Sequence, residues 1–199
     1  MSIRHGLLTL LAEQPSYGYQ LRSRLEARTG GTWPLNIGQV YTTLSRLQRD
    51  GLAEEAGEGD GGQTTYRITD AGRAAVVDWF ASPVTRSAPA RDELAIKLAL
   101  AVGSPMADVR QVVQVQRAAT MRSLQELTRL KARADADADL AWLLVLDALV
   151  FQAEAEIRWL DHCESRVARA AARRPAPHPA PAGGRNDADA GAEREGSRR

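Results

Sequence analysis

The side chains best suited to recognition chemistry lie in a segment that the sequence predicts to be helical, residues 37–50. Its aliphatic residues recur every three or four positions and so form one buried stripe: Ile37, Val40, Leu44 and Leu47. The opposite side carries hydrogen-bonding side chains and arginines, with no carboxylate before Asp50: Gln39, Thr42, Thr43, Arg46 and Arg49. Arginine bonds bidentately to guanine, glutamine to adenine, and threonine offers a hydroxyl or a methyl group. This face is therefore suited to the edges of base pairs in a major groove.

Tyr41 borders this polar face, where it is placed to reach a sugar or a phosphate. The alternative interpretation is an ordinary amphipathic helix whose polar side is solvated. Taken alone, the helix favours neither interpretation, so the elements around it decide between them.

Two further helices are expected to precede the polar helix. The first has Ile3, Leu7 and Leu10 on one face and ends at Pro15. In the second, Ser16 is the expected N-cap, and apolar residues then repeat every four positions until Gly30 and Gly31: Tyr17, Leu21 and Leu25. Asn36 is the expected cap of the polar helix, which Gly51 ends.

A β-hairpin is expected to follow, with strands at residues 52–56 and 63–69 and a glycine-rich tip at residues 57–62. A fourth helix, capped by Thr69 or Asp70, ends before Pro83. Helices followed by a hairpin in this order are typical of a winged helix. The tip also matches the dinucleotide fingerprint G-x-G-x-x-G, but that motif requires a helix after it, and here a strand is expected.

The hairpin offers Thr64 and Arg67 for contacts with a phosphate backbone or a minor groove. Its acidic residues oppose that role, because they repel phosphate: Glu54, Glu55, Glu58 and Asp60. We therefore expect Thr64 and Arg67 to lie nearer DNA than the first strand does.

Long helices are expected at residues 104–133 and 139–171. Residues 140–151 are apolar nearly all round, which requires burial on every side. A second copy of the chain is the natural partner, and the predicted dimer interface comprises Leu140, Leu143, Leu144, Leu146, Val150, Phe151 and Ile157. Three aromatic residues are candidates for a pocket that binds a small apolar or aromatic effector, although simple packing is the alternative: Trp142, Phe151 and Trp159.

Composition narrows the remaining classes. The net charge is only +1, so any basic surface must be local, and the single cysteine, Cys163, excludes an intrachain disulfide. We expect no metal site and no cofactor, since His5, His162 and His178 are scattered. The sequence shows no signal peptide and no apolar run that approaches a membrane span, which predicts a cytoplasmic protein.

The predicted fold class is mainly α with a small α+β component: an N-terminal winged helix-turn-helix domain with a two-stranded β-wing, followed by a helical dimerisation region. The expected parts are a DNA-binding domain (1–82), a connector with a short helix (83–103), the dimerisation region (104–171) and a disordered tail (172–199). The tail contains no aromatic or branched aliphatic residue that could offset its ordering entropy.

Four segments resemble the PadR family of transcriptional regulators: residues 6–11, 16–21, 33–52 and 66–72. The resemblance implies a dimeric winged-helix protein, usually a repressor that binds a double-stranded DNA operator. Such proteins are often released from the operator by a small molecule. It implies DNA contacts from Tyr17, Tyr19, Gln39, Tyr41, Thr42, Thr43, Arg46, Thr64 and Arg67. For Tyr17 and Tyr19, a packing role is an equal alternative.

Other functional classes fit less well. No Ser/His/Asp or Cys/His set has supporting spacing, so no catalytic residue is predicted. A winged-helix module that binds protein rather than an operator remains the main alternative. RNA binding is disfavoured, because no exposed aromatic platform is evident in the sequence.

Overall fold

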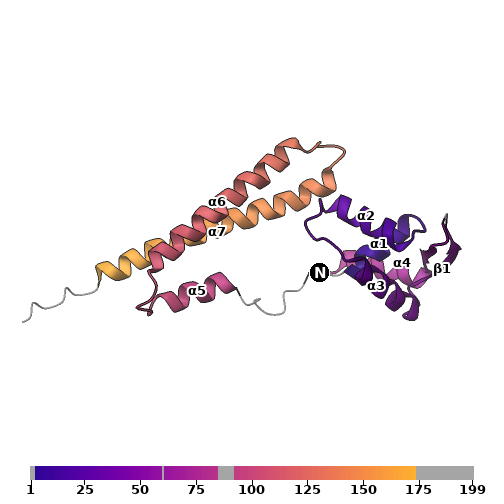
Figure 1. The fold of residues 1–199 in the computed structure, drawn as a ribbon, viewed down its shortest axis with the longest axis horizontal. Helices are drawn as coiled ribbons and strands as arrows, with labels where there is room; N and C mark the ends of the chain where they lie inside the picture. Colours follow the sequence, from indigo (N-terminus) through magenta and orange to yellow (C-terminus); the bar gives the residue numbers. More distant parts are fainter. Residues whose placement is uncertain (1–2, 60, 85–91, 174–199) are drawn as a thin grey trace, which may run out of the picture.

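The computed structural model describes residues 3–59, 61–84 and 92–173. Its N-terminal part contains α1 (Ile3–Glu13), α2 (Gly18–Arg28), α3 (Ile37–Arg49), β1 (Ala53–Glu58), β2 (Thr64–Ile68) and α4 (Asp70–Ala81). Three helices, a two-stranded antiparallel hairpin and a fourth helix make a winged helix, as the sequence predicts (Figure 1).

The core of this part is formed mainly by leucine side chains from α1, α2 and α3. Leu7, Leu8, Leu21 and Leu44 are fully buried, and Tyr66 of β2 joins the same cluster. Burying one such leucine contributes roughly 1.5–3 kcal/mol. The core therefore fixes the hairpin and α3 against α1.

The hairpin pairs Glu54 with Arg67 and Glu55 with Tyr66, with a bulge between Glu55 and Gly57. Gly57 adopts a φ of 111°, which other residues rarely adopt. At its inner end the hairpin gains a third pairing, because the backbone N–H of Ser16 donates to the Tyr66 carbonyl at 3.0 Å and that of Tyr66 donates back at 3.1 Å.

This pairing corrects one expectation. Ser16 does not cap α2. It is fully buried beside β2, and α2 begins at Gly18 after an extended Tyr17. The backbone N–H of Tyr17 donates to the Gln20 side chain at 3.2 Å instead. Asn36 and Thr69, by contrast, are confirmed as caps, since their side chains accept from the backbone of Gly38 and Gly72.

An ionic cluster fastens the end of α1 to α2. Glu13 pairs with Arg24, and both its carboxylate oxygens accept from Arg28, at 2.7 and 2.9 Å. The hydrogen bond from Arg28, followed by the positive charges of both arginines, lowers the pKa of Glu13 below its ordinary value, against the opposing effect of burial. The Arg24 guanidinium also donates to Ser16, at 3.2 Å, and so ties the hairpin junction into this cluster.

The C-terminal part contains α5 (Glu93–Ala101) and a long antiparallel hairpin of α6 (Val109–Arg133) and α7 (Leu140–Ala172). Leu98, Val113 and Leu160 form a small buried cluster where the three helices meet. Thr120 and Gln116 donate to the Glu156 carboxylate across the hairpin, at 2.5 and 2.9 Å. Within the described residues, none of the helices combines the length and the apolarity that crossing a bilayer requires.

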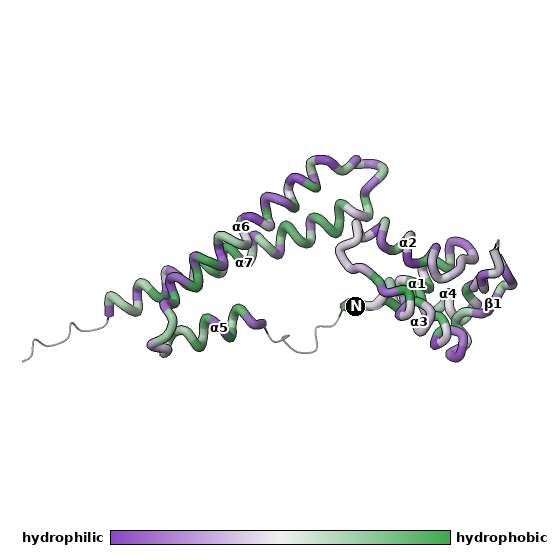
Figure 2. The backbone as a smooth tube through the Cα atoms, viewed as in Figure 1, coloured by the Kyte–Doolittle hydropathy of each residue, from purple (hydrophilic) through white to green (hydrophobic). Residues whose placement is uncertain are grey.

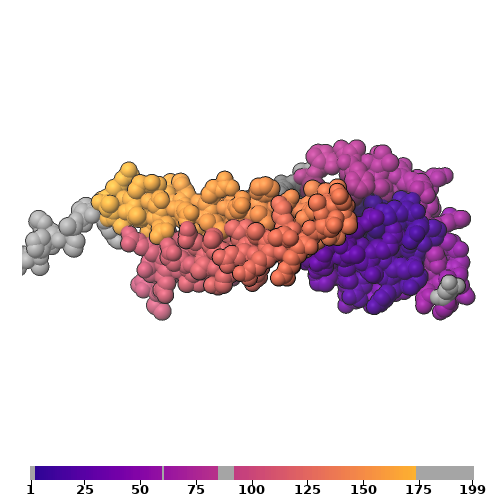
Figure 3. Space-filling view, turned by 90° about the horizontal axis from the view of Figure 1, so that it is seen from above, coloured from indigo at the N-terminus to yellow at the C-terminus, as the bar shows by residue number. Residues whose placement is uncertain are grey.

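The two parts meet at the N-terminal end of α7, where this helix contacts α2 (Figures 1 and 3). The hydropathy colouring shows that α5 and the first half of α7 are rich in apolar residues, whereas α6 alternates between polar and apolar (Figure 2). The tail predicted to be disordered lies, from residue 174 on, outside the described residues.

Candidate nucleic-acid interface

α3 is held with one face inward and the other in solvent. Val40, Leu44 and Leu47 are fully buried, which fixes the rotation of the helix about its axis. Asn36 begins the helix by accepting from the Gly38 N–H at 2.8 Å. The side opposite the leucines is therefore presented outward by packing rather than by chance.

The outward side brings together the residues expected to read base pairs. Gln39, Thr42, Arg46 and Arg49 are exposed, and Thr43 is half-buried. All of these except Arg49 line a shallow depression with Ile3, Asn36 and Gly38. Sequence periodicity alone thus places these side chains on one solvent-facing surface, which we call the α3 polar face.

The side chain of Arg46 makes no ion pair or hydrogen bond among the described residues. The other arginines of the winged-helix part are bonded: Arg4 and Arg49 to Asp50, Arg22 to Glu26, Arg24 and Arg28 to Glu13, Arg67 to Glu54, and Arg73 to the Ala12 carbonyl. A guanidinium without an intramolecular partner can bind a ligand without first breaking a hydrogen bond or an ion pair. Arg46 is therefore the arginine best prepared for an external acceptor.

Three hydroxyl groups of α3 bond to the helix itself. Thr42, Thr43 and Ser45 donate to the carbonyls four residues earlier, at 2.8, 2.7 and 3.0 Å. Their oxygens keep lone pairs, so they can still accept from the amino groups of adenine or cytosine. Sequence analysis missed Ser45, although its position three residues after Thr42 places it on the same exposed side.

The tyrosines at the crossing of α2 and α3 have different roles. The Tyr41 ring lies over Gly18, where a Cβ would sit 2.8 Å from Cζ, and it is 41% exposed. Tyr19 is 60% exposed, with the Arg22 guanidinium 5.9 Å from its ring centroid. Tyr17 is half-buried at the start of α2. Tyr41 thus combines packing with an exposed edge, and Tyr19 is the more accessible of the two residues on α2.

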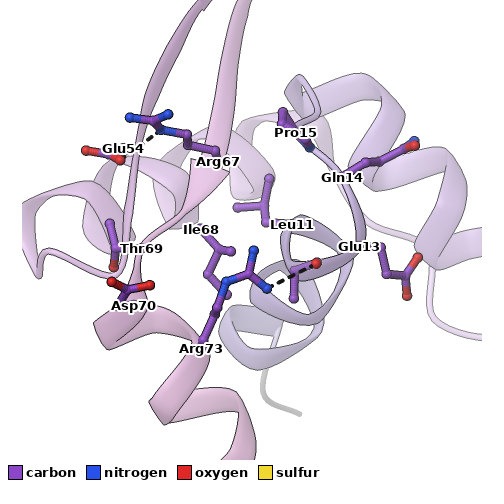
Figure 4. Close-up of a pocket in the computed structure, with 11 residues that line it drawn as sticks. Leu11, Glu13, Gln14, Pro15, Glu54, Arg67, Ile68, Thr69, Asp70 and Arg73 are labelled. Carbon is purple, nitrogen blue, oxygen red and sulfur yellow. Dashed lines mark hydrogen bonds and ion pairs between the residues drawn. The ribbon is translucent and has the colours of Figure 1, made fainter.

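The wing places its predicted residues less favourably. Arg67 donates to Glu54 across the strands at 2.8 Å, on the opposite side of the hairpin from Tyr66 and Glu55. Glu55 accepts from Gln48 of α3, so the α3 side of the wing is the Glu55 side. Figure 4 shows Arg67 and Glu54 beside the end of α1 and the start of α4. Contacts from Arg67 and from the half-buried Thr64 to DNA stay predictions.

No group of three or more His, Cys, Asp or Glu side chains within the described residues could hold a metal ion. His5 stacks on Trp79, with the ring centroids 5.2 Å apart, and Cys163 is a free, half-buried thiol.

Comparison with known proteins identifies this arrangement. Residues 7–78 match the family model of the PadR-like transcriptional regulators, and residues 90–168 match that of the virulence activator alpha C-terminal region. The winged-helix part of the chain matches the PadR family. Members of this family are regulators rather than enzymes.

Individual relatives match most of the length of the chain. A probable transcriptional regulator of Mycobacterium tuberculosis, Rv1176c, is 29% identical over 81% of this chain and 95% of its own. The Vibrio cholerae virulence activator AphA superposes with a TM-score of 0.62 at 23% identity, over 85% of this chain and 99% of its own. Bacillus subtilis PadR in complex with operator DNA gives 0.63 at 21% identity, over the same shares of the two chains.

The residues of the predicted dimer interface differ in their exposure to solvent. Leu140, Leu144 and Phe151 are 59%, 63% and 66% exposed, and three others are half-buried: Leu143, Val150 and Ile157. Leu146 is fully buried within the single chain. We therefore correct the predicted interface by removing Leu146, because its side chain already has an intramolecular environment.

The predicted effector pocket is not assembled within one protomer. Trp142 lies against Gly30, Phe151 is exposed, and Trp159 packs on the Leu98–Val113–Leu160 cluster. Trp142 and Trp159 are 17 positions apart on one straight helix, a rise of about 25 Å. That separation is too large for one small ligand to contact both residues of a single protomer, so a pocket of these three aromatic residues at a dimer seam stays a prediction.

Proposed function

We propose that this regulator binds double-stranded DNA in a sequence-specific manner as a homodimer, with α3 in the major groove. The observation that carries the proposal is the α3 polar face, on which Arg46 is free of intramolecular partners among the described residues. Arginine and glutamine at this spacing suit guanine and adenine edges. A module that only bound protein would have no need of an uncompensated arginine between hydroxyl groups.

The homodimer is supported by apolar surface on α7. Leu140, Leu144 and Phe151 are spaced four and seven positions apart, which places them on one side of the helix. Large apolar side chains in a row are characteristic of a surface that a partner covers. A twofold-symmetric pair presents two α3 helices to two half-sites of a palindromic operator.

Repression is the proposed output, because a dimer seated on an operator excludes other proteins from the same DNA. By analogy with Bacillus subtilis PadR, for which a structure in complex with p-coumaric acid is known, we infer that a small apolar or aromatic effector releases the DNA. Since the target is chromosomal DNA, we place the protein in the cytoplasm.

Fluorescence anisotropy with duplex DNA from upstream of the protein's own gene tests the proposal. Binding should weaken steeply with salt, because each neutralised phosphate contributes about −0.9 to the slope of log K against log salt. A scrambled duplex and a matching RNA duplex are the controls. Equal affinity for all three, or no binding at low salt, would leave the protein-interaction alternative standing. In vitro transcription from the bound promoter then distinguishes repression from activation.

A further inference from the structure

The contact between the two parts of the molecule depends on Gly30, in the turn after α2. A Cβ built on this residue would lie 2.5 Å from each of three atoms of the Trp142 six-membered ring, Cδ2, Cε3 and Cζ3. Gly30 also has a φ of 56°, in the left-handed region. The indole ring of α7 therefore closes directly on the backbone of the turn, with no space for any side chain between them.

The turn itself is fastened to the winged-helix part. The Gly31 N–H donates to the Glu26 carbonyl at 2.8 Å, and the Leu35 N–H donates to the Glu26 carboxylate at 3.3 Å. Leu35 is 3% exposed within the main core, and Asn36, the next residue, begins α3. A displacement imposed on Gly30 is thus transmitted towards α3 through the hydrogen bonds of the turn and the buried Leu35 side chain.

On the α7 side of this contact, Trp142 lies within the segment that carries the proposed dimer surface. It is the third residue of α7, between Leu140 and Leu144 of the proposed dimer surface. The contact of α2 with α7 is the most extensive one between the two parts among the described elements. One aromatic side chain therefore lies between the surface that pairs two copies and the turn that leads into α3.

We propose that the Gly30–Trp142 contact is a positioning contact, which sets the distance and relative orientation of the two α3 helices in the dimer. The proposal rests on the proposed function. Two recognition helices read a palindrome together when they are held one helical turn, roughly 34 Å, or a multiple of it apart. A change at the contact leaves each α3 polar face intact but moves the two faces relative to one another.

Two adjacent glycines provide a matched experiment. Gly30 and Gly31 both have left-handed φ, 56° and 67°, but a Cβ on Gly31 meets nothing within 4 Å. Alanine introduces similar backbone strain at either position, but only Gly30→Ala displaces Trp142. We expect Gly30→Ala to bind the full palindrome about tenfold more weakly than Gly31→Ala does, with less than about a twofold difference on a duplex carrying one half-site.

Operators with one or two base pairs inserted or removed between the half-sites provide the decisive readout. The wild type and Gly31→Ala should prefer the same spacing, and Gly30→Ala should prefer a different one. Combining Gly30→Ala with Trp142→Ala removes the clash, so the effects of the two substitutions should not add.

Identical behaviour of the two glycine variants on all operators, with the wild type binding normally, would overturn the positioning contact alone. An equal loss by Gly30→Ala on half-site and palindrome would also overturn it, because that pattern reports damage within the winged-helix part. A wild type that bound no duplex at all would overturn the proposed function as well.

Discussion

At the scale of single residues, Arg46 provides the most direct test of base reading. It is exposed on the α3 polar face and has no partner to release among the described residues. We expect Arg46→Ala to weaken operator binding by about 1–3 kcal/mol and to relax specificity at one base-pair position. Binding to a library of operators with single base-pair changes measures this effect.

Arg49→Ala is the matched control, because Arg49 lies on the same helix but is bonded to Asp50 at 3.2 Å. Its removal should weaken all operators evenly, as expected for a phosphate contact, and reduce the salt slope by about 1. If Arg46→Ala gave this same even loss, the role of base reading would be disproved for Arg46.

Residues on α3 were predictable from the sequence because helical periodicity alone determines which side faces solvent. The partners of a side chain were not. Arg67 alternates correctly along its strand, but only the register of the hairpin places Glu54 opposite it. Trp142 lies in an apolar run that indicates burial, and nothing in that run specifies Gly30 as its neighbour.

At the scale of elements, Gly72 determines how closely α4 approaches the hairpin. A Cβ there would lie 2.1 Å from the Leu52 carbonyl oxygen and 2.6 Å from Cγ1 of Ile68. Backbone atoms cannot move aside cheaply, so Gly72→Ala should lower the free energy of unfolding by about 1–3 kcal/mol or more. Urea denaturation measures the change.

Gly103→Ala is the corresponding control, since a Cβ at Gly103 meets nothing within 4 Å. It should leave the urea midpoint unchanged or slightly raised. Equal midpoints for the two variants would show that α4 does not pack on the hairpin as closely as described.

The ionic cluster between α1 and α2 makes stability depend on pH. The pKa of Glu13 is lowered, chiefly by the hydrogen bond from Arg28. The contribution of the Glu13 carboxylate to stability is therefore complete above the ordinary glutamate pKa of about 4.3. It is lost as the pH falls through the lowered pKa of Glu13. Because the side chain is 39% exposed, we expect a contribution below about 1 kcal/mol.

The measurement compares unfolding free energies of the wild type and Glu13→Gln at pH 7 and at pH 3. The difference between them should be present at pH 7 and shrink at pH 3. Glu126→Gln, at an exposed position on α6 with no ion pair among the described residues, should show no such difference. A constant difference for Glu13→Gln across this range would contradict the role of its charge.

Element boundaries were predictable where a local signal fixes them. Asn36 and Thr69 cap their helices as expected, because capping involves only the next few residues. Ser16 has the same capping chemistry, but its backbone pairs with Tyr66, 50 positions later in the sequence. A long-range pairing of this kind competes with a local cap and leaves no trace in the sequence near residue 16.

At the scale of the whole molecule, the sequence indicated that residues 140–151 must be covered but not by what. In the structure, different residues of this segment have different environments. Leu146 is buried within the chain, and Trp142 lies against the winged-helix part. Leu144 and Phe151 are exposed to solvent. When a helix is apolar on nearly every side, helical periodicity cannot predict which of its residues are buried within the chain and which stay exposed. That prediction requires the positions of α6 and α2 relative to α7.

The residues left in solvent give the last prediction. In a twofold interface each residue occurs twice, so one substitution introduces two changes. Leu144→Glu places an unpaired charge on each side of the proposed seam, and desolvating such charges is costly. We expect sedimentation to show a dimer for the wild type at micromolar concentration and a monomer for Leu144→Glu, which should also lose its preference for a palindrome over a half-site.

Gln125→Glu adds the same charge at an exposed position of α6 and controls for net charge alone. It should remain a dimer with wild-type operator preference. If Leu144→Glu stayed dimeric while retaining its fold, the seam would have to lie elsewhere, and the exposed Leu140, Leu144 and Phe151 would lose their explanation. Dissociation of both variants would instead indicate that the dimer responds to total charge rather than to this apolar row.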